Sequence, residues 1–287
     1  MVSVTKLAHV GFRAQNLSTQ AEFYNDRWGL DRIDEHGGEM FFRADGPDHH
    51  VLTLHSAESP GLHHFALEVA SAEELDRAAD ELAARGLNIV MPPTAGLEPG
   101  VAKAMRFCDP EGNLVELISG VDTVSDAYGF RDVKPVGLNH VVLEANDRVA
   151  LESFYRDVLG FKLTDQLADF MTFFRCNANH HSLAFIKTPN GQPGFNHAAF
   201  EIRNWEEWMK AVFYAGERGI PRVWGPGRHL AGNNLFSYYR DPENNTIEYT
   251  AEVEQITAPD YVPKLRNPPI ADQWKTVGQS GPGGGRA

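Results

Sequence analysis

The chain contains one pattern written twice. His140 lies 131 residues after His9, and matching residues follow each histidine at similar intervals. The motif at 61–69 recurs at 194–202, and the acidic motif at 109–116 recurs at 241–248. Because 287 residues is near the size at which one hydrophobic core stops growing, the repeat predicts two domains of about 120 residues each. Each copy therefore carries an equivalent set of two histidines and a glutamate on three well-separated segments: His9, His64 and Glu116 in the first, and His140, His197 and Glu248 in the second.

Helix signals fall at equivalent places in the two copies. Ser71 and Glu74 form a capping box, which predicts a helix that runs to Arg85 and stops at Gly86. The corresponding helix begins at 204 and ends before 219, and an earlier helix in each copy is expected over 21–28 and 150–159. Short apolar strands surround these helices, so each copy has the order of two βαβββ modules. The predicted fold class is α+β, with two tandem domains.

The repeat also predicts where the domains begin and end. We expect an N-terminal domain over residues 1–120, a C-terminal domain with the active centre over 135–255, and a tail over 256–287. The last residues of the tail are rich in Gly and are predicted to be disordered. Residues 263–274 include aromatic and apolar side chains, so this segment is expected to fold back over the second copy.

Charge and composition exclude several kinds of partner. The net charge is −13 and the pI is about 5.3, so the chain should repel the phosphates of nucleic acid and of membrane surfaces. No apolar run approaches the roughly 20 residues that cross a bilayer, and residues 1–6 lack the apolar part of a secretory signal. We therefore expect a soluble, cytoplasmic protein. Cys108 and Cys176 lie in different copies without a Cys-x-x-Cys motif, so both are expected to be reduced.

The second copy surrounds its histidines and glutamate with further polar residues. Around Glu248 the sequence alternates with a period of two, which places Glu248 on one strand face with Thr246 and Thr250. A curved sheet with His140 and His197 on the same inner face would direct two imidazoles and a carboxylate at one point. This is the facial arrangement that leaves open positions on non-haem Fe(II). A lone histidine in an apolar strand is more often a core residue, but two histidines and a glutamate recurring in register favour a metal site.

These residues resemble the vicinal oxygen chelate superfamily, and within it the two-domain type I extradiol catechol dioxygenases. The resemblance covers about residues 6–255 and includes Leu-Asn-His at 138–140, Phe-Asn-His at 195–197 and Thr-Ile-Glu-Tyr at 246–249. It extends to His-His-Ser-Leu-Ala at 180–184 and Gly-Arg-His at 227–229. It implies two vicinal-oxygen-chelate domains, each an open barrel of paired βαβββ modules. The implied metal ligands are His140, His197 and Glu248, and the implied catalytic residues are His181, His229 and Tyr238.

The resemblance also implies a reaction and its partners. A substituted catechol would bind Fe(II) through both oxygens, and both atoms of O2 would enter a ring-opened semialdehyde or keto acid. Mn(II) also suits two imidazoles and a carboxylate. If its imidazole can exchange a proton near pH 7, His181 would take the remaining phenolic proton and later return one. His229 and Tyr238 would hydrogen-bond the reacting oxygens, and a homo-oligomer is expected.

One residue bears on the choice of substrate. Relatives that accept diols with a carboxylate arm have an arginine before Gly-Pro-Gly-Arg-His, whereas this chain has Trp224 there. Burying an unpaired carboxylate against an aromatic wall costs several kcal/mol, so an alkyl- or aryl-substituted catechol is favoured. Arg222 or Arg228 could still supply a positive charge, and the segment around Trp274 could line the entrance.

The first copy lacks part of this set. It keeps His9, His50, His64 and Glu116, but Arg106 stands ten residues before the glutamate and Leu97 nineteen before it. The first copy therefore lacks counterparts of Tyr238 and His229. A domain that retains the fold without a metal is the simpler interpretation, and a second metal at His9, His64 and Glu116 is the alternative.

Two other functions occur on the same fold. A glyoxalase or epimerase uses a metal without O2, and the combination of His181, His229 and Tyr238 argues against that chemistry. A bleomycin-resistance-like protein sequesters a ligand without metal catalysis. Such a protein would be unchanged by ferrous iron and inert towards catechols.

Overall fold

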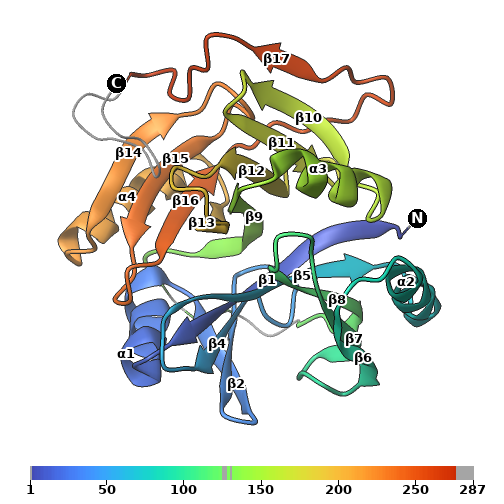
Figure 1. The fold of residues 1–287 in the computed structure, drawn as a ribbon. Helices are drawn as coiled ribbons and strands as arrows, with labels where there is room; N and C mark the ends of the chain where they lie inside the picture. Colours follow the sequence, from blue (N-terminus) through green and yellow to red (C-terminus); the bar gives the residue numbers. More distant parts are fainter. Residues whose placement is uncertain (1, 125–127, 130, 276–287) are drawn as a thin grey trace.

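The computed structural model describes residues 2–124, 128–129 and 131–275, which form two mixed β-sheets, one from each copy of the repeat (Figure 1). The predicted disorder of the last residues falls on 276–287, outside the described part of the chain. The strands of the first sheet are β1 Val4–Ala14, β2 Asp31–His36, β3 Glu39–Arg43, β4 Leu52–Ser56, β5 Gly61–Val69, β6 Ile89–Ala95, β7 Val101–Cys108 and β8 Leu114–Val121. Those of the second are β9 Pro135–Ala145, β10 Lys162–Leu167, β11 Met171–Arg175, β12 Leu183–Lys187, β13 Gly194–Ile202, β14 Arg222–Arg228, β15 Leu235–Arg240, β16 Thr246–Ala251 and β17 Lys264–Arg266.

Both sheets are assembled from paired modules. The first has the order β2-β3-β4-β1-β5-β8-β7-β6. Its central strands β1 and β5 are antiparallel to each other, β4 is parallel to β1, and β8 is parallel to β5. The second has the order β14-β15-β16-β13-β9-β12-β11-β10-β17, with β9 and β13 in the central positions. This arrangement confirms the predicted α+β class with two tandem domains. It also places β9, β13 and β16 side by side, and these strands carry the predicted metal ligands.

The helices begin where side-chain caps are available. α2 (Ala72–Ala84) and α4 (Trp205–Glu217) start directly after Ser71 and Asn204, whose side chains accept hydrogen bonds from the first turn as predicted. The helix expected over 21–28 is found within a longer helical segment whose last six residues are π-helical. α1 (Leu17–Glu22) begins at a cap on Asn16 and continues as the π-helix η1 (Phe23–Trp28). Likewise α3 (Arg148–Asp157) begins two residues before the predicted start, because Asp147 caps it.

The two domains are held together by reciprocal contacts. The hydroxyl of Tyr24 donates to Asp241 at 2.9 Å, and that of the equivalent Tyr155 donates to Asp109 at 3.0 Å. Each aspartate closes the turn before β16 or β8 and is buried. The same acidic motif therefore serves both as a turn and as an acceptor for the opposite domain. These contacts fix the second sheet against the first.

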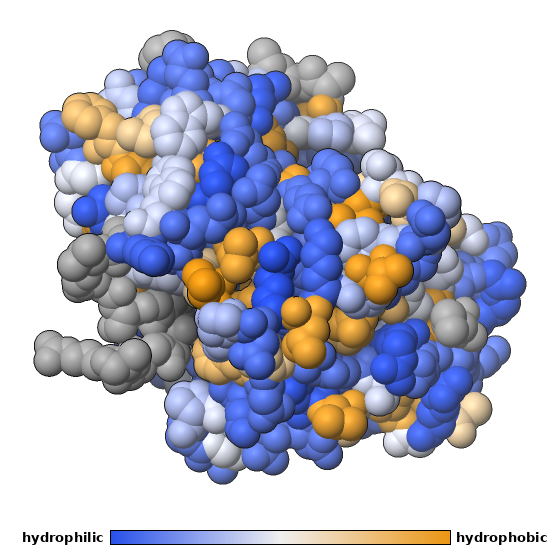
Figure 2. All heavy atoms as spheres, turned by 90° about the horizontal axis from the view of Figure 1, so that it is seen from above, coloured by the Kyte–Doolittle hydropathy of each residue, from blue (hydrophilic) through white to orange (hydrophobic). Residues whose placement is uncertain are grey.

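The tail folds back over the second domain, as predicted for residues 263–274. β17 pairs in parallel with β10, and Asp272 bridges to His229. Figure 2 shows the face seen from above as predominantly hydrophilic, with separate apolar patches. Among the described residues no helix is long and apolar enough to cross a membrane.

Candidate metal centre

Three side chains from three neighbouring strands converge in the second domain. His140 lies on β9, His197 on β13 and Glu248 on β16, and all three are buried. His140 Nε2 lies 3.3 Å and His197 Nε2 lies 3.2 Å from Glu248 Oε2, and the two Nε2 atoms are 3.4 Å apart. The structure thus brings the three predicted ligands to one point, where they could hold a divalent metal.

The residue before each histidine orients its ring. The Nδ2 group of Asn139 donates to Glu201 and that of Asn196 donates to Glu144, at 3.2 and 3.0 Å. Because carboxylates only accept, each amide turns its Oδ1 towards the histidine, 2.8 Å from Nδ1 of His140 or His197. Nδ1 must then carry the proton in both rings. The Nε2 atoms that face Glu248 are therefore unprotonated, as metal ligands must be.

The donor set matches a cation better than a hydrogen-bonded core. Two unprotonated nitrogens and a carboxylate oxygen lie within 3.2–3.4 Å of one another, and neither oxygen of Glu248 has a hydrogen-bond partner among the residues that the structure describes. Burial alone would raise the pKa of Glu248, but the imidazoles of His140 and His197 hold it below its ordinary value. Burial lowers the pKa of His197 to about 4, against the opposing effect of Glu248. These three groups fit Fe(II), Mn(II) or another divalent ion.

A cavity of about 200 Å³ opens beside the ligands. Among the described residues that line it, none is Asp, Glu, Lys or Arg. Trp224 lines the cavity, whereas Arg222 and Arg228 are not among the described lining residues; Arg228 instead pairs with Glu252. The lining residues are His140, Val142, Leu167, Phe170, Met171, Phe173, His181, Ile186, Asn196, His197, Trp224, His229, Ala231, Tyr238 and Ala271.

His181 is oriented by a chain of buried polar groups. Asp165 on β10 lies 3.2 Å from His180 Nε2, and His180 Nδ1 lies 3.1 Å from His181 Nδ1. If His180 donates from Nε2 to the carboxylate, its Nδ1 accepts from His181, and the free lone pair of His181 is on Nε2. Both histidines lie in the segment before β12. The pKa of His181 is lowered well below its ordinary value, because burial and the imidazoles of His140 and His180 disfavour its charged form.

His229 and Tyr238 form a pair on the opposite wall. Tyr238 is directly opposite Glu248 in the β15–β16 register, and its hydroxyl lies 3.0 Å from His229 Nε2. His229 Nδ1 donates to the carbonyl of Ala271 in the tail at 2.9 Å. Burial and the charge of Glu248 raise the pKa of Tyr238 well above its ordinary value, so the hydroxyl stays protonated and can donate.

Sequence reasoning missed several residues of this centre. The Asn-His dipeptides at 139–140 and 196–197 were visible, but their partners Glu144 and Glu201 lie across the sheet. Asp165 has no sequence motif at all. The tail was predicted to fold over this domain, and among its described residues Ala271 alone lines the cavity, while Trp274 packs against Trp205 with ring centroids 5.7 Å apart.

Comparison with known proteins places this geometry among related chains. The family model described as Glyoxalase/Bleomycin resistance protein/Dioxygenase superfamily matches residues 6–117 and 137–249. Metapyrocatechase 2 of Cupriavidus necator is 32% identical over 199 residues, which covers 62% of this chain and 60% of that protein. The iron-dependent extradiol dioxygenase of Rhodococcus jostii (strain RHA1) is 29% identical over 278 residues, covering 89% of this chain and 91% of that protein.

A solved structure extends the comparison. The crystal structure of the Mn(II)-bound glyoxalase from Novosphingobium aromaticivorans has a TM-score of 0.89 and 34% sequence identity, and covers 98% of this chain and 94% of its own. The overall fold is thus shared along almost the whole chain.

Proposed function

The chain belongs to the Glyoxalase/Bleomycin resistance protein/Dioxygenase superfamily, and from that premise we propose that it is an extradiol dioxygenase that cleaves a substituted catechol with O2. The observation that carries the proposal is the convergence of His140, His197 and Glu248 beside an apolar cavity. Three further polar side chains, His181, His229 and Tyr238, border the same space. Relatives named as extradiol dioxygenases support the same reaction.

The metal would be held by the two Nε2 atoms and the Glu248 carboxylate. When bound, Fe(II) supplies open coordination positions and lowers the pKa of a coordinated hydroxyl. Asn139 and Asn196 keep both imidazoles in the ligating tautomer. We propose Fe(II) as the working metal, with Mn(II) as the alternative, since one similar structure is named as Mn(II)-bound.

His181 is proposed as the general base and acid. Its pKa lies far below 7, so it is neutral and has a free lone pair when substrate arrives. Protonation on Nε2 would give a buried imidazolium, which Asp165 stabilises through His180. The low pKa also makes the imidazolium a strong acid that can donate its proton in a later step. One residue can therefore take a phenolic proton and give it back.

His229 and Tyr238 are proposed to hold the substrate oxygens in place. The carbonyl of Ala271 keeps the proton on His229 Nδ1, so Nε2 accepts from Tyr238 in the resting site. A substrate oxygen near this pair can instead accept a hydrogen bond from the Tyr238 hydroxyl. The Tyr238 hydroxyl can therefore donate its hydrogen bond either to His229 or to the substrate, and neither arrangement buries a net charge.

The cavity wall supports a neutral ring substituent. Trp224 stacks against Tyr238 with ring centroids 5.3 Å apart, and Phe170, Phe173 and Met171 add apolar surface. A carboxylate arm in this space would lack a cationic partner among the lining residues. We therefore propose an alkyl- or aryl-substituted catechol as substrate.

A glyoxalase-type isomerisation is the second candidate, because the similar Novosphingobium structure bears that name. Metal-free protein should be reconstituted without oxygen using Fe(II) or Mn(II), then given air and a panel of catechols. A yellow ring-opened product is expected with alkyl or aryl catechols, and none with the matched Glu248→Gln variant. Conversion of a hemithioacetal without O2 uptake, together with inertness towards every catechol, would favour the glyoxalase instead.

A further inference from the structure

A second cluster of potential ligands lies in the first domain, away from the cavity. We propose that this domain binds its own divalent cation, Zn²⁺ by the nature of the donors, in a closed site formed by His9, His64, Glu98 and Glu116. Three of these residues come from β1, β5 and β8, the strands equivalent to β9, β13 and β16. Glu98 comes from the loop between β6 and β7, and all four are buried.

The spacing of the donor atoms is that of a coordination shell. His9 Nε2 lies 3.0 Å from His64 Nε2, 3.2 Å from Glu116 Oε2 and 3.6 Å from Glu98 Oε2. His64 Nε2 lies 3.5 Å from Glu116 Oε2. Zinc bonds of about 2.0–2.2 Å in a tetrahedron require ligand separations of roughly 3.3–3.6 Å. These four separations, 3.0–3.6 Å, are close to that range, and all four donor atoms lie within 4.8 Å of one another.

The two carboxylates are held so that one oxygen of each faces the cluster. Arg106 donates from Nε to Glu116 Oε1 and from its terminal nitrogen to Glu98 Oε1, both at 2.8 Å. Within the described part of the chain, the remaining oxygens, Oε2 of each glutamate, are buried without a hydrogen-bond partner, as the oxygens of Glu248 are in the second domain. Leaving such oxygens unsatisfied is costly unless a cation occupies the space between them.

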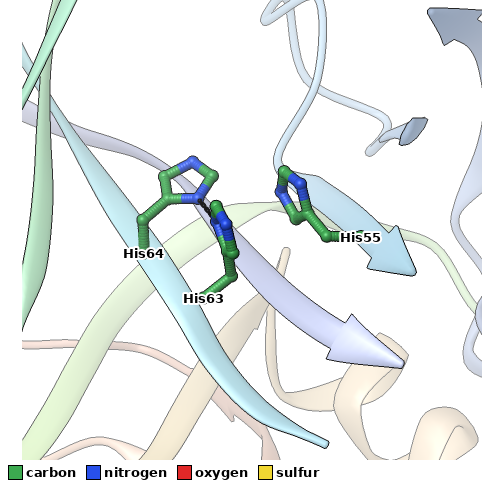
Figure 3. A group of neighbouring side chains, drawn as sticks. All are labelled: His55, His63 and His64. Carbon is green, nitrogen blue, oxygen red and sulfur yellow. Dashed lines mark hydrogen bonds between the residues drawn. The ribbon is translucent and has the colours of Figure 1, made fainter. Parts of the chain in front are cut away.

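The imidazole of His64 is fixed from behind. His63 Nδ1 lies 2.7 Å from His64 Nδ1, the position that the Asn196 amide holds beside His197. Figure 3 shows His63 between His64 and His55, which stacks on it at 3.9 Å. His55 is itself engaged by Thr53 and Glu39, so it supports the site rather than ligating. A Cβ on Gly11 would approach the His64 ring to 2.5 Å, so glycine makes room for this imidazole.

The site differs from the catalytic centre in being closed. Arg106 stands opposite Glu116 in the β7–β8 register, where Tyr238 stands opposite Glu248. Glu98 supplies a fourth ligand where the second domain leaves positions open for substrate. Four protein ligands without an open position are typical of structural zinc. With the cation, two carboxylates and one guanidinium, the net charge is +1, the same as a divalent ion beside Glu248 alone.

A proton on His9 is the competitor for this cation. Burial lowers the pKa of His9, but Glu98 and Glu116 outweigh it and raise the pKa overall. The decisive experiment therefore measures the number of metal ions bound per chain. Full-length wild type and the variants Glu248→Gln, Glu98→Gln and Glu98→Gln/Glu248→Gln are purified, equilibrated with Zn²⁺ and Fe(II) without oxygen, freed of loose metal and analysed by mass spectrometry of the elements.

We expect two metals per chain in wild type, one in each single variant and none in the double variant. The metal retained by Glu248→Gln should be zinc, and Glu98→Gln should keep its iron. Because Glu248→Gln leaves the first domain untouched, its metal content tests the site even if Glu98→Gln folds poorly. A Glu248→Gln protein that binds no zinc overturns the proposal, as does a folded Glu98→Gln protein that still binds two metals. Neither result depends on whether the second domain cleaves catechols.

Discussion

Asp165 should control catalysis although it does not line the cavity. Its carboxylate is fully buried and accepts hydrogen bonds from Arg266 Nε at 2.6 Å and from the Tyr261 hydroxyl at 3.2 Å, and it lies 3.2 Å from His180 Nε2. Burial alone would raise the pKa of Asp165, but His180 and Arg266 lower it overall, so the group is ionised at neutral pH. The charge fixes the tautomer of His180, and through it the lone pair of His181.

Replacing Asp165 with Asn keeps the shape and removes the charge. The amide can turn its NH₂ group to His180, which then donates from Nδ1 and leaves His181 with its proton on Nε2. General acid–base catalysis contributes about 10²–10⁴-fold, and asparagine can still accept from His180 in its other orientation, so we expect a loss of about 10²-fold in kcat. That loss equals about 2.7 kcal/mol in the activation barrier. Loss of the Arg266 ion pair should cost a further ~1–2 kcal/mol of stability.

The assay is steady-state kcat and KM of the metal-loaded enzyme over a range of pH, with metal content measured on the same sample. Tyr261→Phe is the matched control, because it removes a hydrogen bond from the same carboxylate but leaves the charge. Its kcat should stay near wild type, with a stability loss of about 1 kcal/mol. An Asp165→Asn enzyme with wild-type kcat, or an equal fall in Tyr261→Phe, would refute the relay.

Three other perturbations have defined outcomes. A chain ending at Arg266 lacks the Ala271 carbonyl that orients His229, so kcat should fall about tenfold with metal content unchanged, as one lost hydrogen bond predicts; unaltered turnover would count against this role for the tail. Trp224→Arg should raise the kcat/KM ratio for catechols with a carboxylate arm over alkyl catechols by at least about tenfold, and an unchanged ratio would remove Trp224 from substrate selection. The pKa of His197 falls from 6.5 to about 4 on folding, so the unfolded chain binds the extra proton between those values. Metal-free protein should therefore lose up to ~3 kcal/mol of stability as the pH drops through that range, and urea melts that show no loss would contradict it.

The fold and the ligand set could be predicted because both depend on local pattern. The repeat determines the number of domains, and the period of two around Glu248 determines which side chains share a face. Capping residues placed α2 and α4 correctly. The expected range 21–28 did not include the first turn of α1, which begins at Leu17 after the Asn16 cap.

The supporting residues could not be predicted, because they depend on contacts across the sheet. Asp165 reaches His180 only when β10 has been placed beside β11, and no spacing in the sequence indicates it. The repeat gives no signal for Glu98, because counting back from Glu116 pairs His229 of the second copy with Leu97 of the first. Glu98 lies in the loop between β6 and β7, where counting residues along the chain no longer identifies equivalent positions in the two copies.

The fate of the oxygen atoms tests the central claim most directly. Fe(II)-loaded protein is given an alkyl catechol under ¹⁸O₂ in ordinary water, and the ring-opened product is analysed by mass spectrometry. If His140, His197 and Glu248 hold the metal of an extradiol dioxygenase, the product should carry two ¹⁸O atoms, and Glu248→Gln should form none. A metal-loaded protein that consumes no O2 with any catechol, or a product containing a single ¹⁸O before exchange with water, would contradict the account.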